Sequence, residues 1–124
     1  MDALGYHYLI ELYQCDVEVL KNLKKIEIIL NDAINIAGAT KVNEIFHQFS
    51  PQGVSGVIVI KESHFSIHTW PEYGYAAVDF FTCNPKLKIQ DAYQQIVREF
   101  NAKQASIVEI KRGVNKSSLE NRIE

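Results

Sequence analysis

The sequence predicts an α+β fold, a two-layer sandwich in which two helices cover one face of a mainly antiparallel sheet. Two stretches repeat apolar residues at intervals of three and four, the period of an amphipathic helix. Shorter stretches rich in β-branched and aromatic residues, separated by Gly, Pro and Asn, are typical of strands. With 124 residues, 47% of them apolar, the chain is long enough for one soluble domain with its own core.

The N-terminal third is predicted to be a strand followed by helix. Residues 6–13 mix aromatic, β-branched and leucine side chains, which favours a strand. Asp16 then offers a helix cap. From Leu23 the apolar residues follow the helical period, and Gly38 supplies a stop.

The middle of the chain is predicted to be rich in strands. Residues 42–49 form one strand, residues 51–53 a turn, and residues 54–60 a nearly continuous β-branched run typical of a buried strand. Residues 64–70 alternate again, up to a break at residues 71–74.

The C-terminal part is predicted to be a strand, a helix and a strand. Residues 75–83 form a strand that Asn84 and Pro85 end. Residues 89–100 carry the second helical stripe, and residues 105–110 form the last strand. The polar tail after Gly113 is expected to fray.

Composition and charge narrow the class of partner. The formal net charge of −2 comes without a long block of either sign, so we expect neither nucleic acid nor membrane as a partner. The run at residues 57–60 is too apolar to leave one sheet face in water, which predicts a homo-oligomer. Two cysteines, without a disulfide framework, fit a cytoplasmic protein.

Residues 61–72 concentrate serines, histidines and acids between strands, a composition that suggests a site. A metal is not expected, because on a strand His64 and His68 stand about 13 Å apart. A serine hydrolase is disfavoured, since Ser55 lies in a Gly-Val-Ser-Gly stretch without the Gly-x-Ser-x-Gly elbow.

The central region closely resembles the small prokaryotic S-adenosylmethionine decarboxylases. Three motifs carry the resemblance: FSPQGVSG (49–56), ESH (62–64) and HTWPEYGYAAVD (68–79), continued through Thr82 and Cys83. The likeness is strong over residues 46–84, and the flanking elements agree in length and order.

The resemblance implies that the chain cuts itself between Glu62 and Ser63 into residues 1–62 and 63–124. Ser63 would attack the preceding carbonyl and become a pyruvoyl group, which forms a Schiff base with the substrate amine and takes up the electrons released with carbon dioxide. Ser55 and His68 match residues that assist the cleavage, His68 as proton acceptor. Cys83 matches the proton donor of the decarboxylation. Regular alternation would put Ser63 and His68 on opposite sheet faces, so we expect a break at Glu62 and a strand that bends at Ser63 or begins after it.

Two further residues match substrate-binding positions of the family. Phe49 matches an aromatic that stacks on the adenosyl sulfonium, and Glu72 an acid that accepts the ribose hydroxyls. The alternatives are core packing for Phe49 and an exposed turn carboxylate for Glu72. The resemblance also implies a homodimer with sites at its interface. For Cys15, His47 and His64, a structural role is the preferred interpretation.

Two rival functions remain open from the sequence. Some archaeal relatives with the same self-cleaving core decarboxylate arginine, although Phe49 and Glu72 favour an adenosyl group. The other rival is a noncatalytic ligand-binding domain that never cleaves. The predicted activity, S-adenosylmethionine decarboxylation, would supply an aminopropyl donor for polyamine synthesis.

Overall fold

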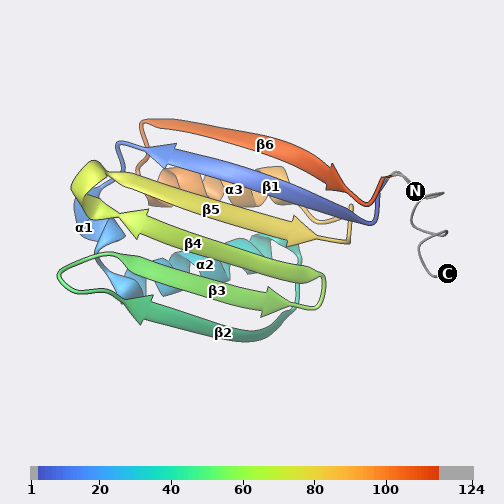
Figure 1. Ribbon diagram of the computed structural model, residues 1–124, viewed down its shortest axis with the longest axis horizontal. Helices are drawn as coiled ribbons and strands as arrows, with labels where there is room; N and C mark the ends of the chain where they lie inside the picture. Colours follow the sequence, from blue (N-terminus) through green and yellow to red (C-terminus); the bar gives the residue numbers. More distant parts are fainter. Residues whose placement is uncertain (1–2, 115–124) are drawn as a thin grey trace, which may run out of the picture.

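A computed structural model describes residues 3–114 as a six-stranded sheet in the order β2-β3-β4-β5-β1-β6, with every neighbouring pair antiparallel. Both long helices lie on one face of this sheet (Figure 1). The predicted two-layer α+β sandwich is therefore confirmed, and the prediction for the tail lies largely outside the described residues. The elements are β1 (Gly5–Tyr13), α1 (Val17–Leu20), α2 (Leu23–Ala37), β2 (Lys41–Gln48), β3 (Val54–Ile60), β4 (Ser63–Trp70), the 3₁₀ turn η1 (Pro71–Tyr73), β5 (Tyr75–Thr82), α3 (Ile89–Glu99) and β6 (Gln104–Arg112).

The caps of the first helices follow from the sequence. The Asp16 side chain accepts a hydrogen bond from the Glu18 N–H at 2.9 Å, and that helix lasts a single turn. Asn22 starts α2 in the same way, from the Lys25 N–H at 3.1 Å. Gly38 ends α2 with φ at 85°, a conformation that glycine adopts without strain.

The core fills the layer between the sheet and the two long helices. Each strand of the sheet's centre sends alternate side chains into it, and α2 and α3 each contribute one apolar stripe. The Thr69 hydroxyl is buried there, where it donates to the Leu20 carbonyl and accepts from the Val54 N–H, both at 2.9 Å. The largest fully buried side chains are Phe65, Phe80, Phe100, Leu12, Leu20, Ile26, Ile29, Leu30, Ile34, Ile58, Ile67 and Ile96.

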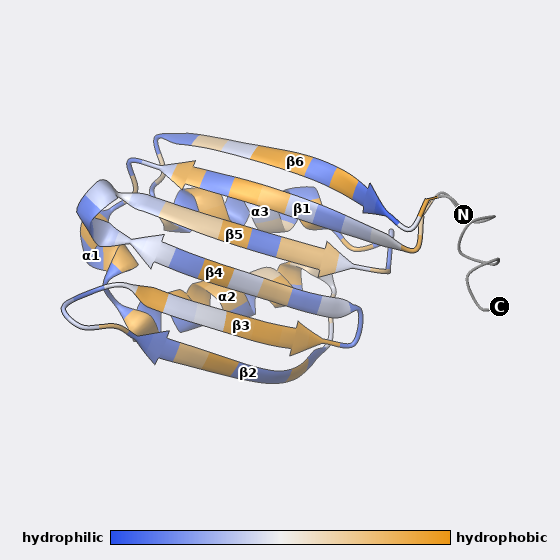
Figure 2. Ribbon diagram, viewed as in Figure 1, coloured by the Kyte–Doolittle hydropathy of each residue, from blue (hydrophilic) through white to orange (hydrophobic). Residues whose placement is uncertain are grey.

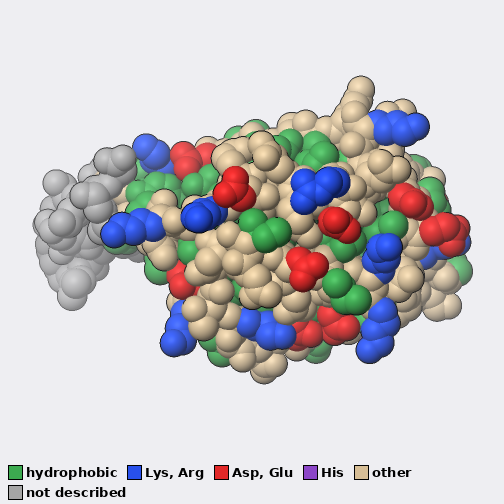
Figure 3. Space-filling view, turned by 180° about the vertical axis from the view of Figure 1, so that it is seen from behind, with side chains coloured by type: hydrophobic (Ala, Val, Ile, Leu, Met, Phe, Trp, Pro, Cys, Tyr) green, Lys and Arg blue, Asp and Glu red, His purple; other side chains and the backbone are tan. Residues whose placement is uncertain are grey.

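The second face of the sheet, here called the open face, carries no helix. Polar and apolar residues alternate along most of the strands, whereas the second half of β3 is continuously hydrophobic (Figure 2). The open face keeps Ile45, Val59 and Trp70 at 68%, 43% and 40% exposure. The helix-covered side looks different, because acidic and basic side chains are scattered over it and no histidine is seen there (Figure 3). The apolar residues of the open face fit the predicted association with a second copy.

Strand boundaries differ slightly from the prediction. β2 ends at Gln48, because Phe49 turns out of the ladder and its N–H donates to the Gly53 carbonyl at 2.8 Å. β5 ends at Thr82, so Cys83 lies just beyond the strand. In the described residues, no helix is long and apolar enough to cross a membrane.

Candidate active site

The bond between Glu62 and Ser63 lies where the β3–β4 hairpin turns. Ile60 pairs with Ser63, so Lys61 and Glu62 form a two-residue loop, and the predicted break at Glu62 is confirmed. β4 begins at Ser63 itself, not after it, and the irregularity there is in its backbone. Ser63 has φ at 147°, which residues with a side chain rarely adopt. Such a conformation costs about 1–3 kcal/mol, and this strain lies at the predicted cleavage bond.

Cys83 contacts this bond through its backbone. Its N–H donates to the Glu62 carbonyl at 2.9 Å, and that carbonyl belongs to the peptide bond preceding Ser63. A hydrogen bond there polarises the carbonyl and stabilises negative charge that develops on its oxygen. The Cys83 side chain is exposed, so a ligand can reach the thiol.

Ser55 and His68 form a second polar group, on the open face of β3 and β4. They face each other across the two strands, and Ser55 Oγ is hydrogen-bonded to His68 Nδ1 at 2.7 Å. They line a shallow cavity of about 230 Å³ together with Ile45, His47, Gly56, Val57 and Ser66. A side chain at position 56 would collide with the Phe46 ring, so the glycine permits this packing.

Phe49 and Glu72 lie at the same end of the sheet as Ser55 and His68. Phe49 is 48% exposed, which rules out the core-packing alternative, and its ring stands edge-on against His47 at 4.6 Å between centroids. Glu72 is an exposed carboxylate in η1, the turn that directly follows β4. Its exposure leaves it free to meet a ligand.

One chain does not bring the two groups together. His68 follows Ser63 by five positions along β4, which corresponds to about 16 Å. Regular alternation along β4 would also put the two residues on opposite faces, but the irregular backbone of Ser63 interrupts that alternation at the first residue of the strand. A group that transfers a proton must come within hydrogen-bond reach of its target, so His68 cannot serve Ser63 of its own chain in this arrangement.

The structure adds a residue that sequence patterns did not single out. His7 lies on the open face of β1, with its ring 5.4 Å from Phe81 and 6.4 Å from His64. Its Nε2 is buried and has no hydrogen-bond partner. A histidine in a strand is too common to stand out, and only the pairing of β1 with β5 puts this one near Cys83.

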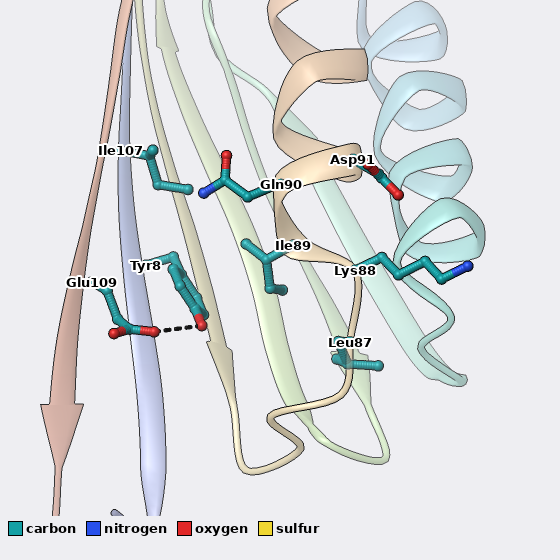
Figure 4. Close-up of a pocket in the computed structure, with 8 residues that line it drawn as sticks. All are labelled: Tyr8, Leu87, Lys88, Ile89, Gln90, Asp91, Ile107 and Glu109. Atoms are coloured by element: carbon teal, nitrogen blue, oxygen red, sulfur yellow. Dashed lines mark hydrogen bonds between the residues drawn. The ribbon is translucent and has the colours of Figure 1, made fainter.

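Another cavity lies on the other side of the sheet. It measures about 510 Å³ and opens between β1, β6 and the start of α3 (Figure 4). On its wall the Tyr8 hydroxyl donates to Glu109 at 2.7 Å, and burial together with this carboxylate raises the pKa of Tyr8. The sheet separates this cavity from the open-face groups, so it is not part of the candidate site.

The described residues also bear on metal binding and on the reactivity of Cys15. Within residues 3–114, no three His, Cys, Asp or Glu side chains come together as a ligand set. Burial raises the pKa of the Cys15 thiol to about 11, so Cys15 stays protonated near neutral pH. This favours the structural role expected for it.

Comparisons with known proteins agree with this arrangement. A sequence model described as S-adenosylmethionine decarboxylase matches residues 6–113. The chain is 54% identical to a protein of Thermodesulfovibrio yellowstonii over 92% of this chain and 84% of that one, and 50% identical to one of Clostridium kluyveri over 97% and 95%. Both are named S-adenosylmethionine decarboxylase proenzyme.

Solved structures give the same likeness. The adenosylmethionine decarboxylase of Aquifex aeolicus superposes with a TM-score of 0.83 at 36% identity, over 92% of this chain and 94% of that one. The AdoMetDC-delta26 monomer of Trypanosoma brucei superposes with a TM-score of 0.61 at 17% identity, which indicates a shared fold. This chain covers 51% of the trypanosomal one.

Proposed function

The chain belongs to the S-adenosylmethionine decarboxylase family, and from this premise we propose that it decarboxylates S-adenosylmethionine with a pyruvoyl group made from its own Ser63. The observation that carries the proposal is the strained Ser63, whose preceding carbonyl accepts the Cys83 N–H. The names of the relatives favour this activity over arginine decarboxylation and over a noncatalytic domain.

Self-cleavage begins at the Glu62 carbonyl. The Ser63 hydroxyl adds to the carbonyl carbon, and the Cys83 N–H stabilises the oxyanion that forms. The acyl group of Glu62 shifts from the Ser63 nitrogen to its oxygen, giving an ester. Loss of the Ser63 α-proton then expels the Glu62 carboxylate, and addition of water with release of ammonia leaves a ketone at residue 63. The strain at Ser63 is relieved when the bond breaks.

The residues around position 63 fit a pyruvoyl group. Such a group supplies a ketone that captures the substrate amine and takes up the electrons released with carbon dioxide. Cys83 lies just beyond the strand that pairs with Ser63, and its exposed thiol supplies the proton that replaces carbon dioxide on the α-carbon. Glu62 becomes the end of the first fragment and leaves the substrate site.

The second polar group reaches the cleavage bond when it comes from another copy of the chain. We propose a dimer in which the open faces pack together and each copy's Ser55 and His68 lie over its partner's Ser63. The exposed apolar side chains of the open face support this dimer, because removing them from water against a second copy is favourable. His68 then accepts the Ser63 α-proton during cleavage, and Ser55 fixes its ring through the 2.7 Å hydrogen bond.

The same packing brings the partner's substrate-binding side chains to the ketone. An exposed aromatic such as Phe49 offers its face to the sulfonium and the adenine. The free carboxylate of Glu72 accepts hydrogen bonds from the two ribose hydroxyls. The free thiols of Cys15 and Cys83 fit a reducing compartment, and we propose the cytoplasm.

The activity is tested by carbon dioxide release. Purified protein is given S-adenosylmethionine or arginine, each labelled in its carboxyl group, beside a Ser63→Ala variant that cannot form the ketone. We expect release from S-adenosylmethionine alone and none from the variant. Release from arginine alone, or equal release by the variant, would contradict the proposal. Gln94→Ala, at an exposed position of α3 on the helix-covered side, is the control and should retain activity.

A further inference from the structure

The half-buried imidazole of His7 has one buried nitrogen with an unfilled hydrogen-bonding position. Its Nε2 has no partner among the described residues, although the atom is out of contact with solvent. Leaving such a group unpaired costs free energy, and native structures retain few of them. A bound ligand that pairs with the nitrogen would explain why it is retained.

His7 belongs to a cluster of three rings that come from three neighbouring strands. The register puts Phe81 of β5 between His64 of β4 and His7 of β1. The ring centroids of His64 and His7 lie 5.7 Å and 5.4 Å from that of Phe81. The ring centroids of His7 and His64 are themselves 6.4 Å apart, so the three rings form a compact ring cluster on the open face.

The cleavage bond lies next to this ring cluster. Ser63 pairs with Thr82, one position further along β4 and β5, and Cys83 follows Thr82. The order across the sheet is thus Ser63 on β4, Cys83 at the end of β5, and the start of β1, where Tyr6 pairs with Thr82. His7 is the next residue of β1 after Tyr6. Because β5 lies between β4 and β1, Cys83 is flanked by Ser63 on one side and by the start of β1 on the other.

The charge around the ring cluster suits an anion. The Arg112 guanidinium lies over the Phe81 ring, 5.8 Å from its centroid. The acids that β1 and β5 carry on the open face lie on the side of the cluster away from Arg112: Asp79 is one open-face position from Phe81, and Glu11 is two from His7. A negatively charged ligand therefore meets cationic or hydrogen-donating groups at this end.

We infer that His7 is a further substrate-binding residue, whose Nε2–H donates a hydrogen bond to the α-carboxylate of the substrate. The inference rests on the proposed function. With the substrate amine at residue 63 and the α-carbon at the Cys83 thiol, the carboxylate is the group that extends across β5 toward β1. Cleavage makes His64 the second residue of a new chain, which frees its ring to move off His7 and open Nε2 to the substrate.

The test compares two ligands that differ only in the carboxylate. Cleaved protein is treated with borohydride, which reduces the ketone, so that ligands bind without turnover. Calorimetric titrations then give Kd for S-adenosylmethionine and for its decarboxylated amine. His7→Asn removes the donor at the Nε2 position, whereas His7→Gln puts an amide nitrogen there. His7→Phe keeps a flat ring without a donor and replaces His7→Asn if that variant does not fold.

We expect His7→Asn to weaken S-adenosylmethionine binding about 10- to 100-fold, the effect of losing one hydrogen bond to a charged group. The Kd of the decarboxylated amine should stay within about twofold, and His7→Gln should bind both ligands much as the original protein does. Equal weakening of both ligands, or unchanged binding of S-adenosylmethionine, would overturn the assignment. An unmodified protein that is not cut, or that binds neither ligand, would instead contradict the proposed function.

Discussion

Ser63 and His68 of one chain lie about 16 Å apart along β4, so His68 of one chain should assist the cleavage of its partner chain. We consider one chain that carries Ser63→Ala and a second that carries His68→Ala, each with its own affinity tag. The first cannot be cut, because it lacks the nucleophile. The second keeps Ser63 and Cys83, and in a mixed dimer its partner supplies the missing His68.

The expected yield follows from the geometry of a two-fold dimer. Expressed alone, each variant should remain uncut, since a histidine about 16 Å away is several times beyond hydrogen-bond reach. Expressed together in equal amounts, about half of the His68→Ala chains pair with the other variant and should be cut after Glu62. Intact-mass spectrometry of the co-expressed mixture measures the fraction.

The result that refutes this reasoning is equally definite. If His68→Ala chains are cut when expressed alone, His68 is not the proton acceptor. If they stay uncut in dimers purified through both tags, the histidine acts within its own chain, and the face-to-face packing is wrong. Gln94→Ala, on the helix-covered side and paired in the same way with Ser63→Ala, should be cut both alone and in the mixture.

Three other changes have defined outcomes. Cys83→Ala should still be cut, because its backbone N–H is retained, but should release carbon dioxide at least about 100-fold more slowly; normal turnover in the labelled assay would remove the proton-donor role. Thr69→Val should lower the free energy of unfolding by about 1–3 kcal/mol in urea titrations, because the buried Val54 N–H and Leu20 carbonyl lose their partner; an unchanged midpoint would show that water or repacking replaces it. Burial holds the pKa of Cys15 at about 11, so iodoacetamide should modify the exposed Cys83 first, and equal labelling of both thiols would contradict the burial of Cys15. The free energy of unfolding should fall as pH rises from about 9 to about 11, because Cys15 ionises at lower pH in the unfolded chain than in the folded one.

The apolar periodicity of the sequence predicted the helices and strands well where one face of the element packs on the core. The apolar stripe of α2 and its stop at Gly38 are local features that the sequence predicted, and both appear in the structure, whereas the cap at Asn22 was not singled out. The extent of a helix was harder to predict. Asp16 starts α1, which lasts a single turn, and a second N-cap at Asn22 starts α2. Propensity alone does not say how far a helix extends, because tertiary packing decides its length.

The site was harder to predict because it depends on which strands are neighbours. The motifs pointed to Ser63 and Cys83, and the pairing of β4 with β5 brings their backbones together. The 147° φ of Ser63 is a property of the hairpin and leaves no pattern in the sequence. His7 is separated from Cys83 by most of the chain, so only the pairing of β1 with β5 reveals it.

The central claim, that the chain makes its own ketone by cutting itself, is tested most directly by the intact mass of freshly purified protein with and without hydrazine. We predict two fragments, residues 1–62 and 63–124, and a hydrazine adduct on the second alone. A single uncut chain of 124 residues that does not react with hydrazine would contradict the account.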